Sequence, residues 1–296
     1  MSLLGFLDRI ADAPALDGID APARAAVSGA LRPQGVKNAL HGTWLGHPLH
    51  PVVAQVPVGS WLSAGLLDAV PPLRPAATLL IATGVAAAVP TALSGAADWS
   101  EQEVGVRRVG LVHAALNTVA LGLYVGSLVA RRRGAGTTGR VLAYAGLSLA
   151  GGSAAVGGHM SYAQSSGTSH AAAAARALTH DEIDLGRLDE LPEGRPVLRT
   201  GEGQGAPVPL AVVRRGNRVD AFVSACAHLG GPLAEGRVET VAGHECLVCP
   251  WHDSAFDLDA GQPRRGPAAV PQEKLVVRHD GDRVLARLPQ RHTEAA

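Results

Sequence analysis

The chain has 296 residues with 26 basic and 26 acidic side chains, so its formal net charge is zero. This balance provides no broad electrostatic attraction to nucleic acid, and we expect no nucleic-acid partner. The length predicts two domains. All three cysteines lie in one C-terminal segment, which leaves none for a structural disulfide elsewhere.

Residues 1–40 begin with a short amphipathic stretch that carries Leu3, Leu4, Phe6 and Leu7. Neither a signal-peptide cleavage pattern nor a twin-arginine motif is visible here. Two interpretations of this segment stay open: a helix that lies on the membrane surface, or a cytosolic tail.

Residues 41–163 contain four long apolar stretches separated by short loops. Each stretch is close to the ~20 residues that a helix needs to cross a bilayer. Helices of a soluble bundle would show a charged face at a period of 3.6 residues, and these stretches show none. We therefore predict an all-α, four-helix transmembrane bundle in the lipid bilayer, with spans at about 51–70, 76–98, 109–130 and 141–162.

Small residues recur every four positions in the last predicted span, at Gly146, Ala150, Ala154 and Gly158. A ridge of small side chains lets two membrane helices approach closely. We therefore expect this ridge to face a neighbouring helix.

Four ionisable residues lie near the ends of the predicted spans: His50, Asp98, His113 and His159. Because spans joined by short loops alternate in direction, all four are expected in the same leaflet. Ionisable groups inside a bilayer are costly and are candidates for a functional site. Three interpretations stay open: a b-type haem bound by two histidines, a quinone held by histidine and aspartate, and structural hydrogen bonds at helix ends.

The fragments Gly46-His47-Pro-Leu-His50-Pro, His113-Ala-Ala-Leu-Asn117 and Gly157-Gly158-His159-Met resemble a bacterial family of four-helix membrane domains of unknown function. The resemblance covers about 40–163 and implies the same membrane bundle. It implies no activity, because none is attached to that family.

The pattern changes after the last span. Residues 164–183 are rich in serine and glycine and then in alanine, which predicts a linker. Beyond it, Gly216-Asn217 and Asp280-Gly281 each separate two short β-type runs, as in β-hairpins. We predict a small antiparallel all-β domain at 184–290.

Two motifs in this domain combine cysteine with histidine: Cys226-Ala-His228 and Cys249-Pro-Trp-His252. Two thiolates and two imidazoles are the ligands of a [2Fe–2S] centre in which histidines replace the cysteines on one iron. The alternative is a structural zinc site that includes Cys246, because Cys246-x-x-Cys249 has the spacing of a zinc knuckle.

The longer segments Cys226-Ala-His228-Leu-Gly-Gly-Pro-Leu and Cys249-Pro-Trp-His252-Asp-Ser-Ala-Phe-Asp resemble the Rieske ferredoxin family. The membrane-domain family named above is sometimes fused to a Rieske domain. The resemblance implies a Rieske [2Fe–2S] cluster, with Cys226 and Cys249 on one iron and His228 and His252 on the outer one. It also implies a third loop, at 266–268, that covers the cluster.

Departures from that family bear on the reduction potential. Gly231 and Trp251 stand where high-potential Rieske proteins carry a loop-linking disulfide, and Phe256 replaces a tyrosine that usually donates to a ligand sulfur. Ser254 is left as a donor to a bridging sulfide. Hydrogen bonds to sulfur stabilise the reduced cluster, so we expect a potential in the lower part of the Rieske range. Asp253 replaces a common glycine and is expected to accept a left-handed backbone.

These features predict a multi-pass protein of the bacterial inner membrane that transfers single electrons. With no export signal visible, its Rieske domain is expected in the cytoplasm. We expect its redox partner to be a reductase, an oxygenase or a respiratory component, and the chain to be an electron-transfer protein rather than a stand-alone enzyme.

Two other classes compete with this interpretation. A terminal oxygenase needs a second, mononuclear iron site, and the about forty residues that follow His252 are too few to form one. The alternative that stays open is a non-redox membrane module whose C-terminal domain is stabilised by zinc.

Overall fold

The computed structural model describes residues 3–178 and 182–289 and divides the chain into two compact units. The helical unit comprises Met1–Val36 and Leu49–Gly167, and the β unit comprises Lys37–Pro48 and Thr168–Ala296. The predicted order of a helical part followed by an antiparallel β domain is confirmed. The segment 37–48 belongs to the β unit although it precedes the long helices, so the helical unit resumes at residue 49 rather than beginning at residue 41.

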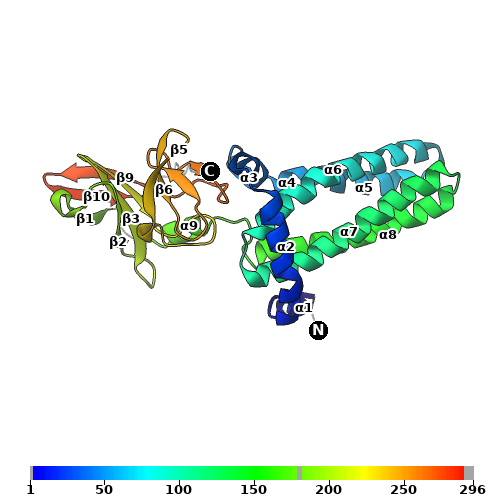
Figure 1. The fold of residues 1–296 in the computed structure, drawn as a ribbon, viewed down its shortest axis with the longest axis horizontal. Coiled ribbons are helices and arrows are strands. Elements are labelled where there is room, and N and C mark those ends of the chain that lie inside the picture. Colours follow the sequence, from blue (N-terminus) through cyan, green and yellow to red (C-terminus); the bar gives the residue numbers. More distant parts are fainter. Residues whose placement is uncertain (1–2, 179–181, 290–296) are drawn as a thin grey trace, which may run out of the picture. The chain divides into compact units, whose positions relative to one another are not determined.

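The helical unit contains α1 (Leu3–Ala11), η1 (Pro14–Leu16), α2 (Asp17–Ala30), α4 (His50–Val53), α5 (Gln55–Asp68), η2 (Pro71–Leu73), α6 (Arg74–Ser100), α7 (Val104–Arg132) and α8 (Gly136–Tyr162). Helix α3 (Gln34–His41) begins in this unit and ends in the β unit. Figure 1 shows α6, α7 and α8 as long rods that succeed one another through short turns.

Three helices are long and apolar enough to cross a membrane: the continuous stretch Pro71–Ser100, then α7 and α8. Within the part of the chain that the structure describes, the predicted span at about 51–70 is not among them. It is divided near Ala54 into α4 and α5, and the 14 residues of α5 extend only about 21 Å. The break has a local cause, because Pro57 lacks the N–H group that would bond the carbonyl of Val53.

The interior of the helical unit combines small residues with a few large side chains, among them the stacked Trp61 and Tyr124. Ala77 and Ala120 are fully buried, whereas Leu66, Leu79 and Val141 are exposed. This distribution suits a surface that contacts lipid and an interior in which backbones approach closely.

The predicted ridge on α8 is confirmed only in part, because Ala150 packs against the core cluster of the helical unit whereas Ala154 does not. The buried residues of this helix are Gly139, Ala143, Gly146, Ser153, Val156 and His159. Only Gly146 belongs to both sets, and Ala154 is exposed. A four-residue step overshoots the 3.6-residue turn, so such a ridge drifts about 40° per step away from one face.

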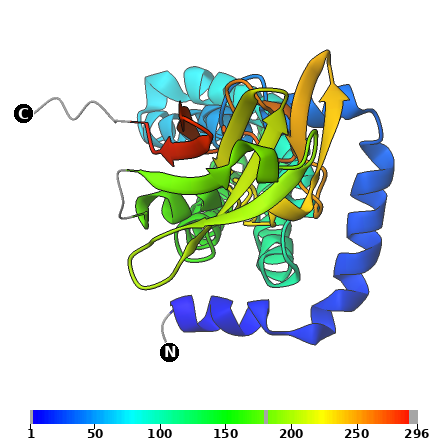
Figure 2. The ribbon, with the colours of Figure 1, turned by 90° about the vertical axis from the view of Figure 1, so that its left-hand side faces the viewer.

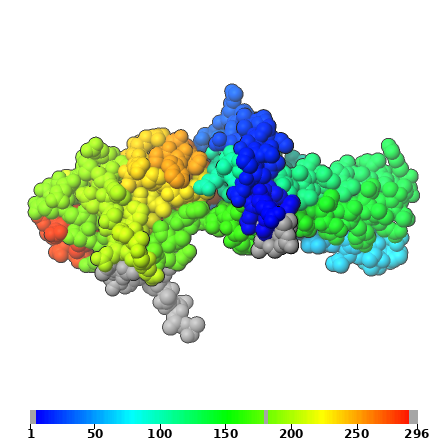
Figure 3. All heavy atoms as spheres, turned by 90° about the horizontal axis from the view of Figure 1, so that it is seen from below, coloured from blue at the N-terminus to red at the C-terminus, as the bar shows by residue number. Residues whose placement is uncertain are grey.

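The N-terminal helices pack onto the long ones, as Figure 3 shows for the blue segment. Leu7 of α1 is buried in a cluster with Val109 and Val156. Asp20 of α2 forms a salt bridge of 2.7 Å with Arg107 at the start of α7. Within the amphipathic stretch, Leu7 and Ile10 therefore pack against protein, whereas Phe6 is exposed.

The β unit contains two antiparallel sheets (Figures 1 and 2). The larger sheet has the order β1-β10-β9-β4-β3-β2, and the smaller has the order β5-β6-β7-β8. The strand bounds are β1 Ile183–Arg187, β2 Pro196–Gly201, β3 Val208–Arg215, β4 Arg218–Val223, β5 Arg237–Val241, β6 His244–Val248, β7 Ala255–Asp257, β8 Pro263–Arg265, β9 Lys274–Asp280 and β10 Arg283–Arg287. Two short helices lie in connections between strands: η3 (Leu188–Glu190) between β1 and β2, and η4 (Leu233–Glu235) between β4 and β5.

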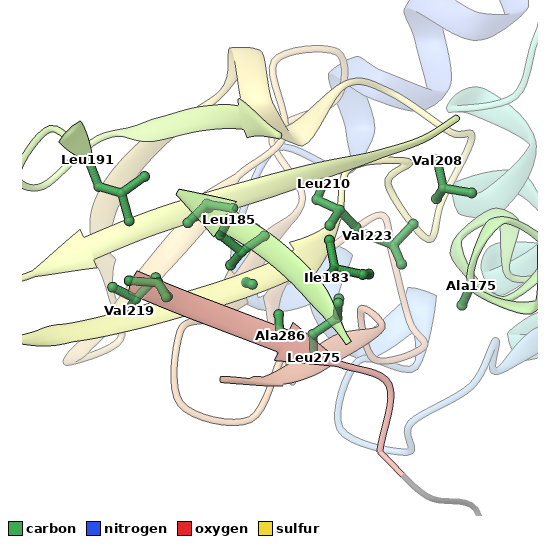
Figure 4. Close-up of a cluster of buried hydrophobic side chains, with 13 residues drawn as sticks. Ala175, Ile183, Leu185, Leu191, Val208, Leu210, Val219, Val223, Leu275 and Ala286 are labelled. Carbon is green, nitrogen blue, oxygen red and sulfur yellow. The ribbon is translucent and has the colours of Figure 1, made fainter. Parts of the chain in front are cut away.

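Alternating side chains of β3 enter two different cores. Leu210 and Val212 belong to the cluster drawn in Figure 4, whereas Ala211 and Val213 belong to a second cluster that also contains Cys226 and Cys249. Successive strand residues point to opposite faces, so a strand buried on both sides is apolar throughout. The predicted ligands are therefore attached to a packed core.

The two predicted hairpins are present. Gly216 and Asn217 connect β3 to β4, with Arg215 paired to Arg218. The second turn lies one residue later than predicted, because Asp280 still pairs with Arg283. Both turns begin with a glycine at φ of 62°, Gly216 and Gly281, a conformation that other residues adopt at a cost.

Part of the segment expected to be a linker, 164–183, forms helix α9 (His170–Arg176). Ser169 caps this helix by accepting the N–H of Ala172 over 3.2 Å, and alanine is the strongest helix former. Ala171 and Ala175 are buried in the two cores of the β unit, so the alanine run packs against the β domain.

Candidate metal centre

Two loops carry the four predicted ligands, and backbone hydrogen bonds close each loop. In the first, which follows β4, the N–H of Cys226 donates to the carbonyl of Gly231 over 2.8 Å. In the second, which follows β6, the N–H of Cys249 donates to the carbonyl of Ser254 over 2.9 Å. Asp253 adopts a φ of 56°, which confirms the left-handed backbone predicted there.

The structure sorts the four side chains into two like pairs. Cys226 and Cys249 are each 1% exposed and are joined by a hydrogen bond between their side chains. The half-buried rings of His228 and His252 have centroids 5.0 Å apart at an interplanar angle of 87°. A thiol pair and an imidazole pair are what a two-iron cluster with mixed ligands requires.

The geometry of the two rings fits such a cluster, in which each iron is tetrahedral. An imidazole nitrogen binds a metal at about 2 Å, which places the centroids of two rings on one tetrahedral ion about 5 Å apart. The Nδ1 atom of His228 is buried without a hydrogen-bond partner, as expected of a metal-binding atom. No three His, Cys, Asp or Glu side chains within residues 3–178 and 182–289 surround one position for a lone ion.

Cys246 lies apart from the other two cysteines. It packs on β6 with Val248 and Ala255, whereas Cys249 packs in the core that contains Phe256. Its thiol donates to the carbonyl of His244 over 3.4 Å. The zinc-knuckle spacing therefore does not produce a shared site.

The environment favours the metal-binding protonation state at Cys249 and His228 and opposes it at Cys226. The hydrogen bond with Cys226 lowers the pKa of Cys249 to about 7, and the N–H groups of Trp251 and His252 act in the same direction. The same hydrogen bond, together with burial, raises the pKa of Cys226 well above its usual range. Burial is the main reason why the pKa of His228 is lowered to about 3. A thiolate and a neutral imidazole are the forms that bind metals.

A hydrogen bond joins the third loop, predicted at 266–268, to the second ligand loop. Ser254 is fully buried, and its Oγ accepts the N–H of Ala268 over 3.0 Å. An accepted bond leaves the hydroxyl proton of Ser254 available for donation, as the predicted role requires. The peptide bond between Gly266 and Pro267 is cis.

Residues 37–48 hold the outer side of the third loop, which the sequence analysis does not anticipate. Asn38 Oδ1 accepts the N–H of Gly266 over 3.0 Å, and Asn38 Nδ2 donates to the carbonyl of Arg264 over 3.4 Å. The ring of His41 lies so close that a Cβ atom on Gly266 would be 3.1 Å from it. More than two hundred residues separate the partners, so no local pattern signals this contact.

Gln272 is a second residue that the sequence analysis does not identify. It is 2% exposed, and its Oε1 accepts the N–H of Ala227 over 2.8 Å. Its Nε2 donates to the carbonyls of Val223 and Ala225 over 2.7 and 2.9 Å. One buried amide thus satisfies three backbone groups of the first ligand loop.

Replacing Gln272 with leucine should lower the free energy of unfolding of the β unit by about 2–4 kcal/mol, because buried backbone groups lose their partners. Thermal unfolding followed by circular dichroism measures this loss. The exposed Gln262 provides the matched control, and Gln262→Leu should change stability by less than about 0.5 kcal/mol. Equal effects of the two substitutions would contradict the role of the buried amide.

In the helical unit the structure brings two of the four predicted polar residues together. The rings of His50 and His113 have centroids 6.5 Å apart. His159 is buried on α8, where its Nε2 lies 3.6 Å from Oδ1 of Asp8 in α1. Asp98 lies in the last turn of α6. The sequence does not indicate which of these residues pair.

Both units match known families. Residues 181–282 match the model of the Rieske [2Fe-2S] domain, and residues 46–174 match that of a predicted membrane protein family (DUF2231).

Relatives with assigned roles match the β unit. The anthranilate 1,2-dioxygenase ferredoxin subunit of Burkholderia cepacia is 34% identical over 94 residues, which are 32% of this chain and 80% of that protein. The ferredoxin component of biphenyl 2,3-dioxygenase from Rhodococcus jostii is 33% identical over 92 residues, 31% of this chain and 79% of its own. Among solved structures, the ferredoxin of carbazole 1,9a-dioxygenase from Nocardioides aromaticivorans is 27% identical and covers 37% of this chain and 100% of its own, with a TM-score of 0.33.

Proposed function

This chain belongs, through residues 181–282, to the Rieske [2Fe–2S] domain family, and on that premise we propose that it is a membrane-anchored carrier of single electrons. A bound Rieske cluster accepts and releases one electron at a time. The helical unit, with three helices fit to cross a bilayer, supplies the anchor. The observation that carries the proposal is the pairing of two buried thiols with two imidazoles in adjoining loops.

We assign Cys226 and Cys249 to one iron, and His228 and His252 to the other. The cysteines are buried and the imidazoles are half-buried, so electrons enter and leave on the imidazole side. Trp251 is 56% exposed, and its ring centroid lies 6.4 Å from that of His252. An exposed aromatic side chain beside a ligand is a suitable contact for a protein partner.

The proposed partners are proteins that exchange electrons with ferredoxins. The relatives named above are ferredoxin components of dioxygenases, which supports a reductase as donor and an oxygenase or a respiratory component as acceptor. A zinc-stabilised, non-redox module is disfavoured, because Cys246 lies outside the site.

We further propose that α4 and α5 together form a fourth crossing. His50 and His113 lie at one level, and Asp68 forms a bidentate salt bridge with Arg131 at another. His50 and Asp68 are 18 residues apart along α4 and α5, and His113 and Arg131 are 18 residues apart along α7. Eighteen residues correspond to about 27 Å of helix. This is close to the ~30 Å thickness of the hydrocarbon core, so the broken helix reaches as deep as α7 does.

The proposed location is the inner membrane with the Rieske domain on the cytoplasmic side. Membrane vesicles test this location and the cluster in one experiment, because dithionite crosses bilayers poorly. In inverted vesicles, added dithionite should produce the paramagnetic signal of a reduced Rieske cluster, with two irons and two acid-labile sulfides per chain. Right-side-out vesicles should show this signal only after detergent is added. A colourless protein that contains zinc would refute the function, and the reverse vesicle pattern would refute the orientation alone.

A further inference from the structure

One local arrangement occurs twice in the helical unit. His50 of α4 has its Nδ1 atom 3.0 Å from the carbonyl oxygen of Thr91 in α6. His113 of α7 has its Nδ1 atom 2.9 Å from the carbonyl oxygen of Ser153 in α8. Each histidine is thus fixed by a backbone carbonyl of the neighbouring helix.

These contacts determine which ring nitrogen carries the proton. A carbonyl oxygen only accepts, so Nδ1 of each ring is the donor and Nε2 keeps its lone pair. The hydroxyl of Ser153 donates to the carbonyl of His113 over 3.1 Å and therefore also acts as an acceptor toward Nδ1. Metal-binding histidines typically have one nitrogen held by such an acceptor and the other free for the metal.

A glycine follows each accepting carbonyl after four residues: Gly95 after Thr91, and Gly157 after Ser153. Side chains on a helix tilt toward its N-terminus, so a Cβ at the fourth position would cover the carbonyl one turn earlier. A Cβ on Gly95 would lie 2.8 Å from Nδ1 of His50, and one on Gly157 would lie 3.1 Å from Cε1 of His113. The repeated glycine therefore makes room for the ring.

The separation of the rings points to ligands on opposite sides of one metal. With nitrogen–metal bonds of about 2 Å, two opposed rings have centroids about 6.3 Å apart, whereas two rings at a tetrahedral angle have centroids about 5 Å apart. His50 and His113 are at 6.5 Å, and the cluster histidines His228 and His252 are at 5.0 Å.

The protein supplies only two ligands at this position. No group of three His, Cys, Asp or Glu side chains suited to a metal ion occurs in the described parts of the chain. A bare ion needs about four ligands, so two opposed histidines require a cofactor that contributes the remaining ligands in a plane between them. An iron porphyrin does this.

We propose that His50 and His113 are the two axial ligands of one haem in the helical unit. Helices α4 and α7 supply the ligands, and α6 and α8 supply the carbonyls and glycines that orient them. Asn117 Nδ2 lies 3.1 Å from Nε2 of His113, so this amide would have to turn away for iron to bind that nitrogen. The site is separate from the Rieske cluster and gives the membrane part a redox centre of its own.

Titration of the purified full-length protein with haemin tests the proposal. One equivalent should bind and give the six-coordinate, low-spin spectrum of iron with two imidazole ligands. His50→Ala and His113→Ala should abolish this spectrum and weaken haemin binding at least tenfold. His47→Ala should leave both unchanged, because His47 is exposed and its Nδ1 contacts the adjacent Pro48 carbonyl.

Glycine variants on α8 provide a matched pair. Gly157→Ala should weaken haemin binding, whereas Gly152→Ala should not, because a Cβ on Gly152 meets no atom within 4 Å. The far-ultraviolet circular dichroism signal of α-helix, measured on the detergent-solubilised protein, reports folding of the helical unit in every variant. A histidine variant that loses that signal as well as the low-spin spectrum needs a second test. In that case His113→Gly is measured with added imidazole, which should take the place of the missing side chain and restore the low-spin spectrum. The proposal is overturned if the wild type gives no low-spin spectrum, if both histidine variants keep it, or if imidazole fails to restore it.

Discussion

Replacing His228 with cysteine should retain a two-iron cluster and lower its reduction potential by roughly 100 mV or more. A thiolate adds one negative charge where a neutral imidazole stood, which disfavours the extra electron. Rieske centres have potentials of about −150 to +300 mV, whereas plant-type clusters with four cysteines lie near about −400 mV. A potentiometric titration of the paramagnetic signal measures the shift.

Cys246→Ser is the control for this substitution. Cys246 is buried on β6 in a cluster separate from the ligand cysteines, so its replacement should leave the potential unchanged. A potential of His228→Cys equal to or above that of the wild type would contradict the electrostatic account of the imidazole pair.

Replacing Asp68 with alanine should destabilise the helical unit by about 3–5 kcal/mol, because it leaves a buried arginine without its counter-charge. The side chains of Asp68 and Arg131 are 1% and 8% exposed and form a bidentate salt bridge between α5 and α7. The temperature at which half of the detergent-solubilised protein aggregates should fall accordingly.

Removing both charges should be far less harmful than removing one. Asp68→Leu combined with Arg131→Met leaves no unpaired charge, and buried ion pairs are often replaced by apolar residues at little cost. Arg132→Ala is the matched control, because Arg132 is exposed one position further along α7. An additive loss in the double variant would show that the salt bridge does not couple these helices.

The residues of the proposed cluster site could be identified from the sequence because each motif is local. Cys226 and His228 share one loop, and Cys249 and His252 share another, so the spacing within each loop already reflects the geometry of the site. The left-handed Asp253 and the buried, separate Cys246 follow from the same short-range considerations.

In the helical unit, the sequence did not predict which face of a helix is buried or where a helix is interrupted. Apolar length alone predicts four spans, but the effect of Pro57 on the carbonyl of Val53 divides the first one. The four-residue spacing of small residues on α8 misplaces the buried face, because the helix repeats every 3.6 residues.

The sequence by itself determined the type of cluster and the presence of a membrane-type helical part, since these depend on residue types within single segments of the chain. Only the tertiary structure decided that Gln272 holds the first ligand loop, that Asn38 holds the third loop, and that His50 pairs with His113 rather than with His159. Those contacts join residues about forty or more positions apart, and they arise from how helices and strands pack. A hydrogen bond between distant residues depends on the position of both backbones, which no local pattern specifies.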